Sequence, residues 1–221
     1  MRAINNGNGK HAPRMRGENR REQILDVAIR LFSQKGFRGT TTKEIALAAG
    51  VNEAIIFRHF TTKRDLYSAI LDRKASSTVA VETQVEKAMA SKDDRAVFEH
   101  IAKHILDQHD QDDSFMRLIC YSALEGHELA EMFHHRQLTR YYQYLADYIK
   151  GRVADGMFRR VDALTTVRVF VGMVLYHAQM KRFYGTGLLN ISNNAAAKRF
   201  TDICFNGILA QAPTLKTGSR P

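Results

Sequence analysis

The sequence predicts an all-α fold in two parts, a small N-terminal domain of three helices and a larger helical domain. Apolar residues recur at helical spacing along the chain, and no segment shows the alternation typical of strands. The three prolines, Pro13, Pro213 and Pro221, lie near the ends, so the chain between them lacks the strongest helix breaker. A length of 221 residues with 44% hydrophobic content suffices for one small and one larger domain.

Residues 1–18 are rich in Asn, Gly, Arg and Lys and are expected to form a flexible basic arm. Such an arm either follows DNA into a minor groove or makes no specific contact, and the composition leaves both open. A helix is expected to begin near Asn19 and to end at Gly36, with Phe37 closing back onto Phe32. Its apolar stripe consists of Ile24, Ala28, Leu31 and Phe32.

Residues 41–60 fit two short helices joined by a glycine turn. In the run TTKE from Thr41, a threonine side chain can accept the N–H three residues on while the glutamate reaches back, which is a capping box. Gly50 can leave a helix sharply in the left-handed conformation, and Asn52 is a good N-cap. The interlocking residues are expected to be Ile45, Ala46, Ala49, Val51, Ile56 and Phe60. This pattern is typical of a helix-turn-helix, whose second helix enters a DNA groove.

The net charge of the chain is concentrated near its beginning. The formal charge is +10, and residues 1–65 hold 13 Lys and Arg against 6 Asp and Glu. A basic first third beside a nearly balanced remainder favours phosphate binding by one part of the molecule. Helix–glycine–helix corners also occur in proteins that never touch DNA, and basic surfaces can serve anionic membranes or solubility, so these alternatives stay open.

About fifty residues of the N-terminal third resemble the DNA-binding domain of TetR-family transcription regulators. The resemblance is carried by Arg21-Glu22-Gln23-Ile24-Leu25, Ala28, Leu31-Phe32, Gly36-Phe37, Thr40-Thr41, Ile45-Ala46, Ala49-Gly50-Val51-Asn52, Phe57-Arg58-His59-Phe60, Lys63 and Leu66. It implies an all-α homodimer, usually a repressor released from a palindromic operator by a small ligand. Ala54 departs from the pattern where glycine is frequent, and Phe57 stands where a tyrosine hydroxyl often meets a phosphate.

Within this segment, the residues expected to lie against DNA phosphates are Thr41, Thr42, Lys43, His59 and Lys63. Those expected on the face towards the bases are Glu53, Ala54, Ile55 and Arg58, together with Phe57. Glu53 can accept from a cytosine amino group, Ile55 can pack on a thymine methyl, and Arg58 can pair with guanine or a phosphate.

The expected domains are a helix-turn-helix DNA-binding domain at 19–65, a helical ligand-binding and dimerisation domain at 66–210, and a flexible tail at 211–221. One helix is expected from Lys63 to about Met89 as a link between the domains. Five more are expected at 93–109, 113–125, 128–152, 162–184 and 194–210. The helix from Asp113 is apolar nearly all round and is expected to be buried centrally.

A small-molecule pocket in the larger domain would be built from aromatic and methionine side chains. The candidates are Phe98, Tyr121, Leu124, Phe133, Tyr141, Tyr144, Phe170, Met173, Tyr176, His177 and Met180, which alternatively only fill the core. The last two helices carry an apolar excess that suggests the dimer interface, although a membrane or partner helix would also fit it. The candidate interface residues are Val169, Phe200, Ile203, Cys204, Gly207 and Ile208.

Other classes of function find little support in the sequence. The histidines at His100 and His104, or at His127 and His134 with Glu131, do not complete a metal site, and no nucleotide-binding, hydrolase or CxxC motif is present. We therefore expect no enzyme activity, no metal and no cofactor. Two distant cysteines and the lack of a secretory signal or membrane-length apolar run indicate a cytoplasmic protein without a membrane partner.

The sequence thus favours a ligand-responsive DNA-binding repressor, acting as a homodimer on a double-stranded operator and released by a small, mainly apolar effector. Two alternatives stay open. One is a ligand-independent DNA-organising protein with a filled C-terminal core, and the other is a helical metal-dependent protein.

Overall fold

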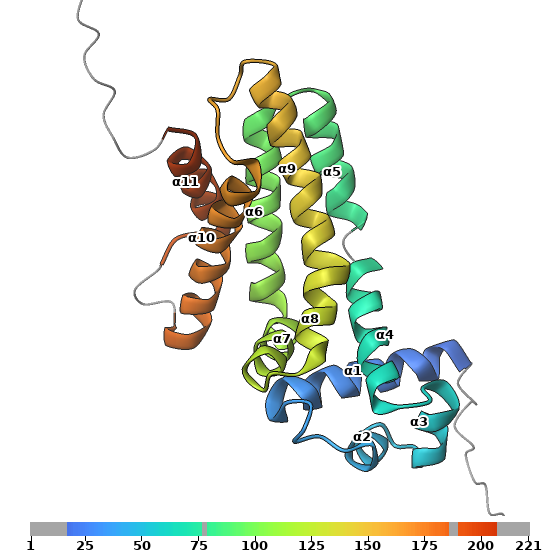
Figure 1. Ribbon diagram of the computed structural model, residues 1–221. Coiled ribbons are helices and arrows are strands. Elements are labelled where there is room, and N and C mark those ends of the chain that lie inside the picture. Colours follow the sequence, from blue (N-terminus) through green and yellow to red (C-terminus); the bar gives the residue numbers. More distant parts are fainter. Residues whose placement is uncertain (1–16, 77–78, 186–189, 207–221) are drawn as a thin grey trace, which may run out of the picture. The chain divides into compact units, whose positions relative to one another are not determined.

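The computed structural model describes residues 17–76, 79–185 and 190–206, and the regular structure within these ranges is helical (Figure 1). The helices are α1 Gly17–Lys35, α2 Thr42–Ala48, α3 Glu53–His59, α4 Lys63–Ser76, α5 Val79–Ala90, α6 Asp94–Gln111, α7 Ser114–Leu124, α8 Glu128–Phe133, the π-helical turn η1 His134–Leu138, α9 Thr139–Ala154, α10 Ala163–Tyr184 and α11 Asn193–Asn206. The all-α prediction is therefore confirmed for the described part of the chain.

One of the expected helices contains an irregular turn. The helix expected at 128–152 includes the π-helical turn η1, where the Thr139 hydroxyl donates to the His134 carbonyl at 2.9 Å. This turn is not marked by proline or glycine, so helical periodicity alone could not place it. The segment expected as one helix from Lys63 to about Met89 is helical in α4 and α5, and residues 77 and 78 between them lie outside the described residues.

The chain divides into two compact units, and the division differs from the expected domain boundary. Unit 1 comprises residues 1–73 and 114–130, and unit 2 comprises residues 74–113 and 131–221. Unit 1 therefore contains α7 in addition to α1, α2, α3 and most of α4. Figure 1 shows α2 and α3 on one side of α1 and α7 against its C-terminal end. The functional division at residues 65 and 66 stays a prediction.

Unit 1 is centred on an aromatic cluster of Phe32, Phe37 and Tyr67. The ring centroids of Phe32 and Phe37 lie 5.6 Å apart, as the sequence predicted, and Tyr67 packs on both at 5.6 and 5.7 Å. The Tyr67 hydroxyl donates to the Leu118 carbonyl of α7 at 3.4 Å, and burial raises the pKa of this phenol. The cluster thus joins α1, the turn after it, α4 and α7.

Helix α7 holds the C-terminal end of α1. The Arg117 guanidinium donates to the Ser33 carbonyl at 3.2 Å, and the Glu125 carboxylate accepts the Arg38 N–H at 3.5 Å. A Cβ added at Gly36, whose φ is +72°, would lie 2.1 Å from Glu125 Oε1, so the backbone approaches this carboxylate closely.

The expectation of a centrally buried helix from Asp113 is wrong. Only Leu118 and Ser122 of α7 are buried, and Leu124 at its end is 87% exposed. Its inner face is covered by α1, which lies far from it in sequence. Apolar composition on all sides did not reveal which side would be covered.

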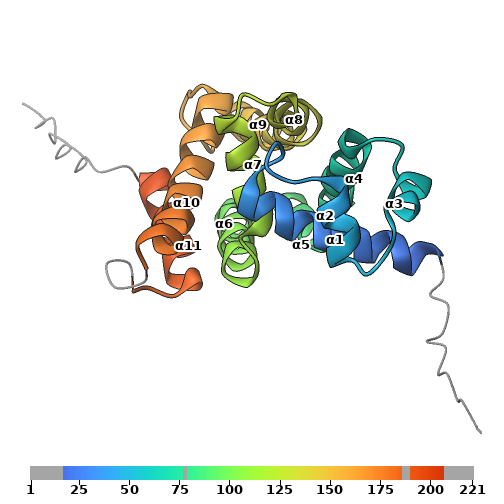
Figure 2. The same ribbon diagram turned by 90° about the horizontal axis from the view of Figure 1, so that it is seen from below.

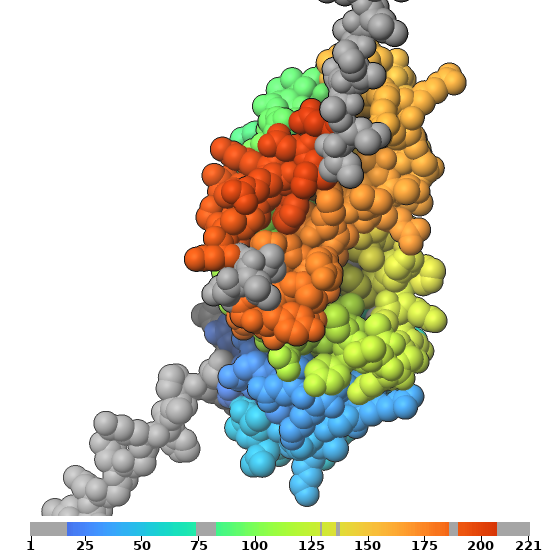
Figure 3. All heavy atoms as spheres, turned by 90° about the vertical axis from the view of Figure 1, so that its left-hand side faces the viewer, coloured from blue at the N-terminus to red at the C-terminus, as the bar shows by residue number. Residues whose placement is uncertain are grey.

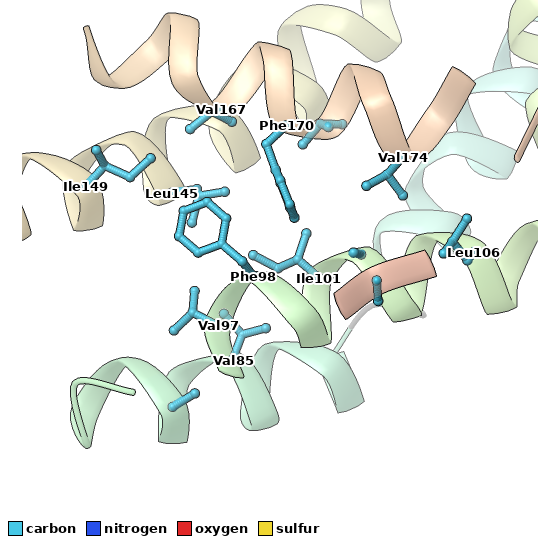
Figure 4. Packing of buried hydrophobic residues seen from close by; sticks show 14 of the residues in the cluster. Val85, Val97, Phe98, Ile101, Leu106, Leu145, Ile149, Val167, Phe170 and Val174 are labelled. Carbon is cyan, nitrogen blue, oxygen red and sulfur yellow. The ribbon is translucent and has the colours of Figure 1, made fainter. Parts of the chain in front are cut away.

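Unit 2 is a helical bundle with its own apolar core between α5, α6, α9, α10 and α11. Phe98 of α6 packs edge to face on Phe170 of α10 at 4.9 Å and on Phe205 of α11 at 5.1 Å. Figure 4 shows Phe98 and Phe170 directed towards each other, with Ile101 and Leu145 beside them. Aromatic side chains from three helices therefore fill the middle of this core.

Two polar networks tie the helices of unit 2 together. Arg152 of α9 donates through Nε and Nη2 to the two carboxylate oxygens of Asp94 at 2.7 and 2.8 Å, and the Tyr148 hydroxyl donates to the same carboxylate at 2.5 Å. The other network pairs the end of α10 with α6 and with the second residue after it, through Lys181–Asp110 and Arg182–Asp113, both at 2.6 Å. These contacts fix the register of the packed helices.

Candidate nucleic-acid interface

The first helix of the candidate DNA-binding segment begins with the capping box predicted from the sequence. The Thr41 N–H donates to the Glu44 carboxylate at 2.8 Å, and the Glu44 N–H donates to the Thr41 hydroxyl at 3.1 Å. Lys35 of α1 lies 2.8 Å from the other oxygen of the same carboxylate. The hydrogen bond from Lys35, followed by those from Thr41, lowers the pKa of Glu44 to about 2.

The turn between α2 and α3 also has the predicted geometry. Gly50 has a φ of +65°, and the Val51 N–H donates to the Ala46 carbonyl at 3.0 Å. The Asn52 side chain caps α3 by accepting the Ile55 N–H at 3.0 Å. The predicted interlocking residues Ile45, Ala46, Ala49, Ile56 and Phe60 are all buried, and Val51 is half-buried. Residues 41–60 therefore form a helix-turn-helix.

The outward face of α3 is less acidic than the sequence suggested. Ala54 and Arg58 are exposed, Phe57 is 48% exposed and Ile55 is half-buried. The Glu53 carboxylate accepts a hydrogen bond from the Thr42 hydroxyl, which links the first turns of α3 and α2. Glu53 and Thr42 thus satisfy each other within the unit, whereas Phe57 and Arg58 present an aromatic and a cationic group to the outside.

Helix α2 and its N-cap add three exposed side chains to this surface. The N-cap Thr41 and Lys43 of α2 are exposed, as their expected role on phosphates requires. Leu47 is 82% exposed, and sequence reasoning did not select it. Its position outside the buried stripe of Ile45 and Ala46 was the available signal, but a single exposed leucine on a short helix indicates nothing by itself.

Lys63 is directed into unit 1. Its ammonium group donates to the Phe37 carbonyl and lies 4.0 Å from the centroid of the Phe37 ring. Burial lowers the pKa of this amine. The contact joins the start of α4 to the turn after α1, so Lys63 has a structural partner within unit 1. Its expected contact with a phosphate stays a prediction.

His59 closes α3 and is half-buried. Burial lowers its pKa, and the positive charges of Arg58, Arg21 and Arg20 lower it further. Arg20 and Arg21 belong to α1, and sequence reasoning did not place them beside α3. They lie in the basic N-terminal third, but no local spacing connects them with a helix that begins more than thirty residues later.

The candidate pocket residues are not all in one unit. Tyr121 and Leu124 belong to unit 1, and the others belong to unit 2. Phe98, Phe170 and His177 are buried, and the half-buried members are Tyr121, Phe133, Tyr141, Met173 and Met180. Tyr144 and Tyr176 are 44% and 64% exposed. Phe98 and Phe170 therefore fill the core of unit 2, and Tyr141 and Met173 pack against this core.

One side of α10 carries an exposed apolar stripe. Val169, Tyr176 and Phe183, each seven residues apart, are 57%, 64% and 55% exposed. Gly172 lies between the first two, and a Cβ there would meet nothing within 4 Å. Figure 2 shows α10 and α11 side by side, and Figure 3 looks onto them in orange and red.

The candidate interface residues on α11 are only partly at this surface. Ile203 is 45% exposed, whereas Phe200 and Cys204 are half-buried and pack against the core of unit 2. Gly207 and Ile208 lie outside the described residues, as do the tail expected at 211–221 and residues 1–16 of the arm expected at 1–18. Gly17 and Glu18, which were expected in the arm, form the first residues of α1.

Within the described ranges, no three His, Cys, Asp or Glu side chains are grouped as metal ligands would be. Within the same ranges, no helix combines the length and apolarity needed to cross a membrane.

Two family models match successive parts of the chain. Residues 24–70 match bacterial regulatory proteins of the tetR family, and residues 96–203 match the C-terminal domain of AefR-like transcriptional repressors. The HTH-type transcriptional regulator YvkB of Bacillus subtilis is 28% identical over 89% of this chain and 100% of its own length. The HTH-type transcriptional regulator AcrR of Shigella flexneri is 40% identical over 39% of this chain and 40% of its own.

Solved structures share the fold at lower identity. FadR from Bacillus subtilis, solved in complex with stearoyl-CoA, has a TM-score of 0.65 and 18% identity and covers 85% of this chain and 99% of its own. AibR, solved in complex with isovaleryl coenzyme A and operator DNA, has a TM-score of 0.62 and 22% identity and covers 84% and 98%.

The capping box predicts a measurable pH dependence. We expect the Glu44 carboxylate to titrate near pH 2 instead of 4.5 in a carbon-detected NMR titration. Because its pKa is lower in the folded state, the ionised carboxylate stabilises the fold above its ordinary pKa, and this contribution is lost as the pH falls through about 2. Lys35→Met should raise the pKa of Glu44 towards 4.5. The control Lys43→Met should leave it near 2, and equal shifts in both variants would contradict the assigned cause.

Proposed function

Since this chain belongs to the TetR family of bacterial transcriptional regulators, we propose that it is a repressor that binds a palindromic operator as a homodimer. In this proposal the repressor leaves the operator when unit 2 binds a small, mainly apolar molecule. The observation that carries the proposal is the helix-turn-helix of residues 41–60, whose capped helices leave Phe57 and Arg58 exposed on α3. A regulator needs such a rigid reading element, because misplaced side chains cannot meet base edges.

The exposed residues of the segment divide into two groups in this proposal. Ala54, Phe57 and Arg58 of α3 face the major groove, with Ile55 at the margin. Thr41 and Lys43, at the start of α2, lie along the phosphates. Glu53 and Thr42 act mainly by holding α3 against α2, because each already has the other as hydrogen-bond partner. This assignment makes the apolar side chains of α3 the main source of sequence preference.

A dimer is part of the proposal because one helix-turn-helix makes few base contacts and two half-sites add their binding energies. The exposed stripe of Val169, Tyr176 and Phe183 on α10 supports α10 as the pairing helix. Gly172 in this stripe permits the close approach of a second helix. Ile203 extends the apolar surface onto α11.

We propose that the apolar part of the effector is an acyl chain and that the effector is an acyl thioester of coenzyme A, whose coenzyme A part is polar and charged. FadR was solved with stearoyl-CoA and AibR with isovaleryl coenzyme A, and both share this fold. In this chain, Tyr141 and Met173, which are half-buried against the unit 2 core, and the half-buried Met180 offer the adaptable apolar contacts that an acyl chain needs. Effector binding in unit 2 would favour a state in which the two recognition helices no longer match successive major grooves.

Replacing Arg58 tests DNA binding. The duplex is selected from a random library by the wild-type protein, and affinity is measured by fluorescence anisotropy at fixed salt. Arg58→Ala should weaken binding roughly tenfold or more, because a guanidinium contact with a base or phosphate is lost. Arg140→Ala, which removes an exposed arginine of α9, is the matched control and should change little. Equal affinity of the Arg58 variant and the wild type would count against the assigned surface.

Titration with acyl-CoA tests the effector. Stearoyl-CoA or isovaleryl-CoA should lower the affinity of the wild-type protein for the selected duplex at least about tenfold, a typical coupling between two sites. Free coenzyme A is the control and should have little effect, because the acyl chain makes the apolar contacts. If neither thioester changes the affinity, the alternative of a ligand-independent DNA-organising protein gains support.

A substitution on α10 tests the dimer. Tyr176→Glu places a charge in the exposed apolar stripe and should convert the dimer to a monomer of 25.1 kDa in sedimentation velocity at micromolar concentration. Tyr144→Glu, at an exposed tyrosine of α9, should leave the dimer intact. A Tyr176 variant that remains dimeric would mean that another surface pairs the chains.

A further inference from the structure

Three arginines from two helices gather around His59 in unit 1. Burial lowers the pKa of His59, and the positive charges of Arg58, Arg21 and Arg20 lower it further. Arg58 precedes the histidine on α3, whereas Arg20 and Arg21 lie in the N-terminal part of α1. The Arg21 guanidinium carbon lies 5.2 Å from the centroid of the Phe60 ring, which directly follows His59. The start of α1 and the end of α3 therefore form one cationic surface.

Little negative charge from the protein offsets this cluster. Arg20 donates at 2.6 Å to the neutral amide of Gln23, and Arg58 has no carboxylate partner within the described part of the chain. Arg21 lies 3.5 Å from Glu22, but that carboxylate lies closer to Arg73, at 3.1 Å. Elsewhere in unit 1 basic side chains are paired at shorter distance, as in Lys35–Glu44 at 2.8 Å and Arg64–Glu128 at 3.1 Å.

One ring nitrogen of His59, the buried Nε2, has no hydrogen-bond partner within the described residues. A buried N–H without an acceptor would be costly, so the neutral ring places its proton on Nδ1. The three guanidinium groups repel one another and disfavour a proton on His59. A bound anion would attract the three guanidinium groups and would favour the protonated imidazole.

We propose that Arg20, Arg21 and Arg58, with His59 between them, bind one backbone phosphate of the DNA whose major groove α3 enters. This proposal rests on the proposed function of the helix-turn-helix and extends its DNA contacts to α1. The planar guanidinium fork matches the oxygens of a phosphodiester, and three such forks suit one anionic group. The cluster also assigns Arg58 to a phosphate instead of a guanine.

The consequence is a contact that strengthens binding without reading sequence. It also replaces the expected phosphate contact of Lys63, whose ammonium group is held by the Phe37 carbonyl. The Gln23 side chain helps to fix the surface, because its amide donates to the Ala49 carbonyl at 3.2 Å and so ties the start of α1 to the turn before α3.

The salt dependence of DNA binding by the full-length chain tests the proposal. The double variant Arg20→Gln/Arg21→Gln is compared with the wild type by fluorescence anisotropy on the selected duplex and on a scrambled duplex, over a series of KCl concentrations. We expect both affinities to fall by a similar factor, and the slope of log K against log [KCl] to become shallower by about 1 per protomer. Arg30→Gln, at an exposed arginine further along α1, is the matched control and should keep the wild-type slope.

The experiment separates a failure of the α1 phosphate contact from a failure of the proposed DNA-binding function. If the wild type binds neither duplex, the helix-turn-helix assignment fails. If the wild type binds and the double variant keeps its slope while remaining folded by circular dichroism, the phosphate contact at α1 is wrong. A change in preference between the two duplexes would also overturn it, because a backbone contact carries no base information.

A second measurement separates DNA phosphate from free phosphate. The His59 ring protons are followed by NMR with the selected duplex or with inorganic phosphate at equal phosphate concentration and ionic strength. We expect the duplex to shift these resonances and to raise the pKa of His59, and inorganic phosphate to leave both unchanged. An equal response to inorganic phosphate would assign the cluster to a free anion and overturn the DNA contact.

Discussion

The recognition helix of this protein depends on an aromatic cluster that it does not itself contain. Helices α2 and α3 each have seven residues, and helices of this length are not stable alone in water. They are held by a platform of α1, α4 and α7, which meet around Phe32, Phe37 and Tyr67. Because α7 follows α3 by more than fifty residues, the DNA-binding unit is closed by a segment from the second half of the sequence. A substitution that weakens the packing of Tyr67 would therefore disturb the position of α3, although Tyr67 is not part of α3.

The platform also decides which charges remain for DNA. Lys35 is paired with Glu44, Arg64 with Glu128, and the Lys63 ammonium with the Phe37 carbonyl, so these side chains mainly join helices. Glu53, the acidic residue of the recognition helix, accepts from Thr42. The side chains that the proposal assigns to DNA are Lys43 on α2, Phe57 and Arg58 on α3, and the half-buried Arg20 and Arg21 at the start of α1. Arg30 and Arg38 of unit 1 are exposed as well. The internal bonds of the unit thereby separate structural charges from those available to phosphates, a distinction that net charge cannot make.

The helix-turn-helix of residues 41–60 could be predicted from the sequence, because it depends on local chemistry. The packing of the other helices around it could not be predicted. The capping box at Thr41, the left-handed Gly50 and the Asn52 cap act over three or four residues, and each has the predicted geometry. Three other features depend on residues that are far apart in the chain. These are the packing of α7 in unit 1, the hydrogen bond of Lys63 to the Phe37 carbonyl, and the cation–π contact of Arg21 with Phe60. Similarly, the pattern of aromatic residues in unit 2 could not separate Phe98 and Phe170, which fill the core, from Tyr176, which is exposed. Periodicity gives the apolar face of a helix, and packing decides what covers it.

We propose that α3 binds DNA with the support of α1. Amide hydrogen–deuterium exchange of the full-length protein tests this binding mode directly. Exchange would be compared with and without the duplex selected by the wild-type protein. On DNA binding we expect slower amide exchange in α2, in α3 and in the N-terminal part of α1, and a smaller change in the core helices of unit 2. Protection confined to α10 and α11, with α3 exchanging as in the free protein, would contradict it.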